Sequence, residues 1–152
     1  MDRHCPIMSI SSPDAADEWE RIDVTIDSGS AVSAIPESVA KDWPMWECTD
    51  GPAAYTSASD HSVHVKGIKH PRLQFQSGLE ANVSVKVCSP LKKPIFSVAR
   101  MNRAFRIVLD GDESYAECKK TGDKIKIYVR GGVFVMPAWI RKPPFHGQAS
   151  MP

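Results

Sequence analysis

The sequence predicts an all-β protein, either a barrel or a sandwich built from short strands. Three observations favour this class. Apolar and polar residues alternate with the period of two that a half-buried strand requires. Turn-forming clusters such as "DGDES", "KTGD" and "RGG" separate the candidate strands at short intervals. The chain has 152 residues and a hydrophobic content of 42%, which suffices for one domain with a modest core.

The first predicted element is the strand that leads to Asp27, because every second residue of Ile22–Ile26 is apolar. A short helical turn is expected over Pro36–Trp43, with the proline at its first position. Turn formers separate nearly all of the remaining candidates. These further strands are expected at Tyr55–Ser57, Ser62–Lys66, Arg72–Phe75, Ala81–Val87, Ile95–Val98, Arg106–Leu109, Tyr115–Cys118, Lys124–Val129 and Val133–Met136.

The two ends of the chain differ in composition from its middle. Residues 1–19 and 141–152 are rich in polar residues and proline, so a flexible arm and a flexible tail are expected there. The folded domain is expected over residues 20–140. No apolar run reaches the roughly 20 residues that span a bilayer, and the start of the chain lacks the features of a signal peptide. We therefore expect a cytoplasmic protein with no membrane partner.

The cysteines do not predict a metal site. Cys5, Cys48, Cys88 and Cys118 lie singly in the sequence, and none pairs with a histidine at the spacing of metal ligands. In a reducing compartment such residues are expected to be buried thiols. The sequence thus predicts neither a metal nor another cofactor.

The tripeptide Asp27-Ser28-Gly29 is the main candidate site. Taken alone it predicts a plain turn, because Asp, Ser and Gly are all favoured turn residues. Its position adds a second interpretation, since the carboxylate directly follows an apolar strand and small residues such as Ser30 come next. Backbone N–H groups and hydroxyls can then approach the carboxylate. Two such carboxylates sharing one proton would supply the base and the acid that water attack on an amide needs.

Four segments carry a resemblance to a known family. "VTIDSGSAVSAIP" resembles the catalytic segment of retropepsins, the aspartic proteases of retroviruses and retrotransposons. "SASDHSVHVKGIKHPRLQF" resembles the flap segment of the Ty1/copia-type branch. "KPIFSVARMNRAFRIVLDGD" and "KKTGDKIKIYVRGGVFVMPAWI" are similar to two later segments of that branch. Order and spacing are kept over roughly residues 19–140, which is most of the chain.

The resemblance implies a retropepsin-like acid protease barrel with a flap hairpin and one or two short helical turns. It implies an aspartic endopeptidase that acts as a homodimer, because the chain holds one D-[ST]-G and the mechanism needs two carboxylates. Asp27 would be catalytic, supported by Ser28, Gly29 and Ser30. The substrate would be an extended peptide, by resemblance a retroelement polyprotein. The implied flap residues are Ala58, Ser59, Asp60, His61 and Ser62.

Two other functions remain open. The implied flap tip has no glycine, and a fold does not dictate a function. A non-catalytic retropepsin fold, used for dimerisation or peptide binding, is therefore the alternative. The second alternative is a nucleic-acid-associated domain that uses the basic second half of the chain, where the stretch from Lys119 to Arg130 could track phosphates. We favour a solvated outer face for this stretch and expect no nucleic-acid partner.

Overall fold

The computed structural model describes residues 18–56 and 60–143, and its central feature is the strand β1 (Trp19–Asp27). Ile22, Val24 and Ile26 are buried along it, while Arg21 and Asp23 are exposed. This is the alternation expected of a strand with one face in the core. The predicted first strand is confirmed.

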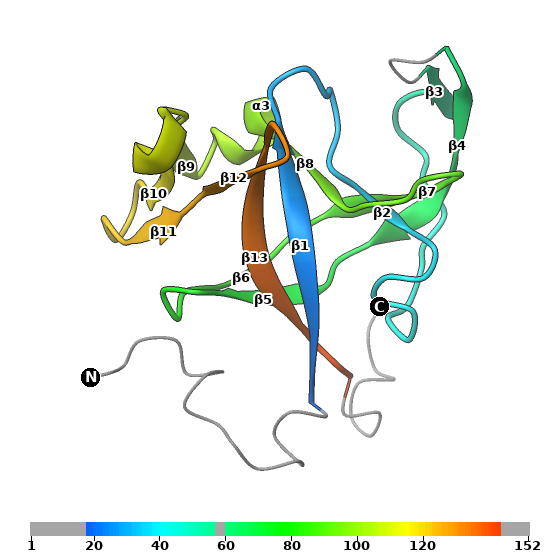
Figure 1. The fold of residues 1–152 in the computed structure, drawn as a ribbon. Coiled ribbons are helices and arrows are strands. Elements are labelled where there is room, and N and C mark those ends of the chain that lie inside the picture. The colour runs from blue at the N-terminus through cyan, green and yellow to red at the C-terminus, as the bar shows by residue number, and fades with distance from the viewer. Residues whose placement is uncertain (1–17, 57–59, 144–152) are drawn as a thin grey trace.

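Two strands from distant parts of the chain flank β1 (Figure 1). The strand β13 (Val133–Arg141) pairs with it antiparallel along nearly its full length. The strand β8 (Ile95–Ser97) pairs with its last three residues in parallel, so Asp27 lies opposite Ser97. The carboxyl end of β1 is thereby fixed beside the carboxyl end of β8.

The ten-stranded sheet has the order β3-β4-β7-β2-β8-β1-β13-β5-β6, with β12 paired to β13. A second sheet of three strands has the order β11-β10-β9. Figure 1 shows the β3–β4 hairpin and the three-stranded sheet on opposite sides of β1 and β13. The remaining strands are β2 (Ala34–Pro36), β3 (Ala54–Thr56), β4 (Ser62–Lys69), β5 (Arg72–Phe75), β6 (Glu80–Asn82), β7 (Val85–Ser89), β9 (Phe105–Val108), β10 (Tyr115–Cys118), β11 (Lys124–Lys126) and β12 (Tyr128–Arg130).

The all-β prediction is confirmed, since strands dominate and the helical elements are short. The helix α3 spans Val98–Met101 and the 3-10 helix η1 spans Gly111–Glu113. Every predicted strand has a counterpart, although two expected strands each divide in two. The chain leaves the sheet between β6 and β7, and between β11 and β12, where the Ile127 N–H donates to the Ser114 carbonyl in another segment.

The helical turn predicted over Pro36–Trp43 is wrong. Pro36 ends β2, and the residues after it form successive turns. The Val39 N–H donates to the Pro36 carbonyl, and the Trp43 N–H donates to the Ala40 carbonyl. Ala40 has a φ of 53°, in the left-handed region, which interrupts any helix at that point.

A single hydrophobic core joins the two sheets. Buried residues of the large sheet, such as Val24 and Met136, belong to the same cluster as Ala116 and Ile125 of the small sheet. The Phe75 and Phe105 rings meet edge to face, with their centroids 6.1 Å apart. The three-stranded sheet is thus part of the same domain. The predicted flexible arm, apart from its last two residues, and most of the predicted tail lie outside the described residues.

In the described part of the chain, no helix has the length and the apolar character needed to cross a membrane.

Candidate functional site

Asp27 is the last residue of β1, and its side chain is partly exposed. Its Oδ1 accepts a hydrogen bond from the Gly29 N–H at 2.8 Å, as in an Asx-type turn. The bond turns the chain sharply away from the strand. Ser28, between these residues, is exposed, and its hydroxyl makes no hydrogen bond within residues 18–56 and 60–143.

The loop after Asp27 is held at both of its ends by side-chain hydrogen bonds. Within the loop, the Ser30 hydroxyl donates to the Val32 carbonyl at 2.7 Å. The fully buried Ser97 hydroxyl donates to the Ser30 carbonyl, also at 2.7 Å. In return, the Ser33 hydroxyl accepts from the Ser97 N–H at 3.0 Å. The loop that orients Asp27 is therefore tied to the end of β8.

Ser97 is also the N-cap of α3, because its Oγ accepts from the Arg100 N–H at 3.3 Å. Arg100 in turn donates from Nε to the Ala31 carbonyl at 3.2 Å. The short helix thus contacts the Asp27 loop directly. Ser97 was not among the predicted site residues, although a serine just before a short apolar segment is a recognisable helix start.

Asp27 lines a cavity of about 640 Å³. One wall is the segment from Asp27 to Ala34, and the opposite wall comes from the β3–β4 hairpin. Among the described residues that line the cavity, Asp27 is the only carboxylate. The others are Gly29, Ser30, Ala31, Val32, Ala34, Tyr55, Thr56, Val63, Cys88, Leu91 and Ile95. The cavity is mainly apolar, with a carboxylate at one side, and it is large enough for amino-acid side chains.

The hairpin that closes this cavity is formed by the pairing of β3 with β4, in which Tyr55 lies opposite Val63. The lining residues come from the body of the hairpin, whereas the predicted flap residues lie at its tip. Among the latter, Asp60, His61 and Ser62 are exposed, and Asp60 has a φ of 65°. Ala58 and Ser59 lie outside the described residues. The register of the hairpin places Tyr55 and Val63 side by side, and both line the cavity.

A second cavity, of about 400 Å³, lies beyond Val32, which lines both cavities. Its described lining residues include three cations, Lys86, Arg100 and Arg103, and one carboxylate, Asp50. The buried Lys86 donates from Nζ to the Asp50 carbonyl at 3.1 Å, and its Nζ lies 3.8 Å from the Asp50 carboxylate.

Lys86 and Asp50 of this second cavity both have shifted pKa values. Burial alone would lower the pKa of Lys86, but interactions with Cys48 and Tyr55 outweigh it, so that the pKa is raised. The Cys48 thiol and then the Lys86 ammonium hold the pKa of Asp50 below its ordinary value. Lys86 is therefore cationic and Asp50 anionic at neutral pH.

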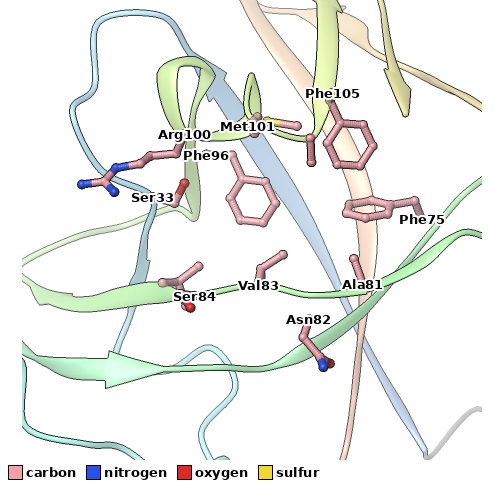
Figure 2. Close-up of a pocket in the computed structure, with 12 residues that line it drawn as sticks. Ser33, Phe75, Ala81, Asn82, Val83, Ser84, Phe96, Arg100, Met101 and Phe105 are labelled. Atoms are coloured by element: carbon pink, nitrogen blue, oxygen red, sulfur yellow. The ribbon is translucent and has the colours of Figure 1, made fainter. Parts of the chain in front are cut away.

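A third cavity, of about 210 Å³, is apolar (Figure 2). Phe75, Phe96 and Phe105 gather on one side of it, and the Arg100 guanidinium points away from them. No residue that lines this cavity also lines the Asp27 cavity.

Metal binding finds no support in the described residues, where no three His, Cys, Asp or Glu side chains converge as ligands. Cys88 lies in the Asp27 cavity, and burial raises the pKa of its thiol.

Comparison with known proteins does not extend this description: no family model, no curated protein sequence and no solved structure matches the chain significantly.

Proposed function

We propose that the chain is an aspartic endopeptidase of the retropepsin type, with a retropepsin-like barrel and one catalytic Asp27 in each subunit of a homodimer. One observation carries the proposal: the Asp27 carboxylate, at the end of a central strand, lines a cavity that Tyr55, Thr56 and Val63 of a β-hairpin also line. A strand end supplies a rigid position, and the hairpin supplies a lid over an extended peptide.

The reaction requires the two Asp27 carboxyl groups of the dimer to share one proton. The ionised carboxylate removes a proton from a water molecule, whose oxygen attacks the carbonyl carbon of the peptide bond. The protonated carboxyl donates its proton to the amide nitrogen, so that the carbon–nitrogen bond breaks and the amine leaves. Two like charges at close range disfavour double ionisation, which keeps one group protonated.

The hydrogen bonds around Asp27 support this role. The Gly29 N–H fixes one carboxylate oxygen at 2.8 Å. Ser97 and Ser33 hold the following loop, so the carboxylate does not depend on mobile neighbours for its orientation. A fixed orientation of this kind is what a reacting group requires, and an Asx-type turn residue has it as well.

The cavity composition also indicates the kind of substrate. Val32, Val63, Leu91 and Ile95 line the cavity beside Asp27, which suits apolar side chains next to the cleaved bond. By resemblance, the natural substrate would be a retroelement polyprotein. A non-catalytic module of the same fold, binding peptides without cleaving them, is the alternative.

The test compares wild type with Asp27→Asn and Asp27→Ala in digests of a mixed peptide library, at about pH 4.5 and about pH 7.5. Both variants should lose cleavage, because neither side chain can act as a base. Asn keeps the oxygen that accepts from Gly29, so Asp27→Asn should keep the stability of the wild type. Ala loses that bond and should cost about 0.5–1.5 kcal/mol of unfolding free energy.

A transition-state-mimicking inhibitor of aspartic proteases supplies the control. Wild-type cleavage that this inhibitor blocks, and that Asp27→Asn abolishes, would support the proposal. Binding of library peptides without cleavage at either pH would instead support the peptide-binding module. Cleavage that persists in Asp27→Asn would contradict the proposed role of Asp27.

A further inference from the structure

The apolar cavity has the size and lining of a site for a small aromatic group. Its volume is about 210 Å³, and a dry apolar cavity of roughly 150 Å³ can hold a benzene molecule. Phe75, Phe96 and Phe105 supply ring surfaces, and Met101 adds an adaptable thioether. The side chains of Phe75 and Phe96 are almost fully buried, so these walls belong to the rigid core.

The adjoining cationic cavity has an excess of positive charge. Three cations, Lys86, Arg100 and Arg103, face one carboxylate, that of Asp50. Lys86 donates to the Asp50 carbonyl and also interacts with Cys48 and Tyr55, so it adds charge to the cavity rather than a free donor. The Arg103 side chain makes no ion pair within the described residues. A cavity with unbalanced cations favours an anionic ligand.

Arg100 joins the two cavities. Ser33, Ser84 and Arg100 line both, so the apolar and the cationic spaces are contiguous. Figure 2 shows the Arg100 side chain starting at the apolar cavity and directing its guanidinium away from the phenyl rings. Its Nε is held by the Ala31 carbonyl at 3.2 Å, which leaves the two terminal amino groups for a bidentate contact with an oxyanion.

We propose that these two cavities together bind a small amphipathic carboxylate, such as an arylalkanoic acid. The aromatic group lies among Phe75, Phe96 and Phe105, and the carboxylate contacts the guanidinium of Arg100, with Lys86 and Arg103 adding positive charge. The site is separate from the Asp27 cavity, with which it shares only Val32. Its existence does not depend on the proposed peptidase activity.

The probes are 3-phenylpropionate, 3-phenylpropan-1-ol and propionate, each titrated into the full chain by calorimetry and by ¹⁵N-resolved NMR. The alcohol keeps the ring but lacks the charge, and propionate keeps the charge but lacks the ring. Charge-assisted hydrogen bonds predict that 3-phenylpropionate binds about tenfold or more tightly than either of the other two. Amide shifts should centre on residues 81–85 and 100–105.

Two variants assign the binding to this site, and two more serve as controls. Arg100→Gln should remove the preference for the acid over the alcohol. Val83→Phe should fill the apolar cavity and prevent both the acid and the alcohol from binding. Lys120→Gln removes the same charge at an exposed lysine away from these cavities and should bind as wild type does. Asp27→Asn should also bind as wild type does, which separates this site from the peptidase.

Arg103→Gln serves as a second charge variant should Arg100→Gln fold poorly, because the Arg100 side chain bonds to the Ala31 carbonyl whereas the Arg103 side chain makes no such bond within the described residues. Arg103→Gln should weaken the binding of 3-phenylpropionate and leave the binding of 3-phenylpropan-1-ol unchanged. Equal affinity of the wild type for the acid and the alcohol would overturn the proposal. Shifts centred on Gly29, Val63 and Ile95 would also overturn it, because they would place the ligand in the Asp27 cavity.

Discussion

Ser97 holds more of the candidate site together than any other single side chain. It is fully buried, and its hydroxyl donates to the Ser30 carbonyl and accepts from the Arg100 N–H. Its backbone N–H donates to the Ser33 hydroxyl. One residue therefore links the Asp27 loop, β8 and the start of α3, and a buried hydroxyl is costly to lose when its partners cannot reach water.

Replacing this residue tests the link. Ser97→Ala leaves the Ser30 carbonyl without a donor and α3 without its cap, so we expect a loss of about 1–3 kcal/mol of unfolding free energy. Urea unfolding measures the loss. Ser28→Ala is the matched control, since Ser28 is exposed, and it should change stability by about 0.5 kcal/mol or less. Equal stability of the two variants would contradict the structural role of Ser97.

Asp50 gives a prediction about pH. The Cys48 thiol and the Lys86 ammonium lower its folded pKa, so as the pH falls the unfolded chain binds the proton first. The stabilisation from Asp50 is therefore present above its ordinary pKa and is lost as the pH falls through the folded value. Asp50→Asn should melt at a lower temperature than the wild type at about pH 7, and this difference should shrink at about pH 3.

The control for this prediction is Glu37→Gln, which removes an exposed carboxylate that does not line the cavity of Asp50 and Lys86. The difference in melting temperature between Glu37→Gln and the wild type should not shrink between pH 7 and pH 3 as it does for Asp50→Asn. A gap for Asp50→Asn that stays constant from pH 7 to pH 3 would mean that its carboxylate charge contributes nothing to stability.

At the scale of the element, the β3–β4 hairpin depends on a close approach at Gly67. The register of β4 against β7 shifts between Val65 and Gly67, as at a β-bulge. The neighbouring segment packs there through two hydrogen bonds between Trp46 and Ile68, at 2.8 and 2.9 Å. A Cβ on Gly67 would lie 2.8 Å from the Trp46 carbonyl oxygen and 2.5 Å from the Met45 Cγ. This position requires a glycine because of its neighbours.

Gly67→Ala should therefore cost about 1–3 kcal/mol of unfolding free energy, as overpacking usually does. Chemical denaturation measures this cost. Adding Met45→Ala should restore only part of the loss, because Met45 is half exposed and flexible while the Trp46 carbonyl belongs to the backbone. Wild-type stability of Gly67→Ala alone would show that the segment at Met45 and Trp46 moves without cost.

For the whole molecule, the main question is how many chains form the proposed active site. In the described part of the chain, Asp27 is the only carboxylate that lines its cavity, and the proposed mechanism needs two. The exposed Ser28 beside it leaves the carboxyl end of β1 open to a second copy. A symmetric dimer would bring two identical cavities together about a twofold axis.

Sedimentation at micromolar concentration should accordingly show a species of about twice the 16.8 kDa chain mass. Asp27→Asn should dimerise at least as strongly as the wild type at neutral pH, because an uncharged amide pair avoids the electrostatic cost of bringing two carboxyl groups together. A strict monomer that still cleaves peptides would contradict the two-chain mechanism. A stable dimer that never cleaves would favour the non-catalytic module.

Local pattern in the sequence determined the all-β class, most strand positions and the placement of Asp27 after a half-buried strand. The alternation of Ile22, Val24 and Ile26 suffices for that strand, because a period of two places these residues on one face. The same local patterns did not predict the helix α3, because its first residue, Val98, is β-branched and favours a strand. They also did not predict the split between β6 and β7.

Only the tertiary structure decided which residues meet around Asp27. β1 takes its neighbours β8 and β13 from about 70 and 110 residues further along the chain. Tyr55 and Val63 enter the cavity because of the register of their hairpin, and Ser97 reaches the Asp27 loop because β8 runs parallel to β1. Contacts across such sequence distances leave no periodic signal, because they depend on strand pairing and core packing rather than on neighbouring residues.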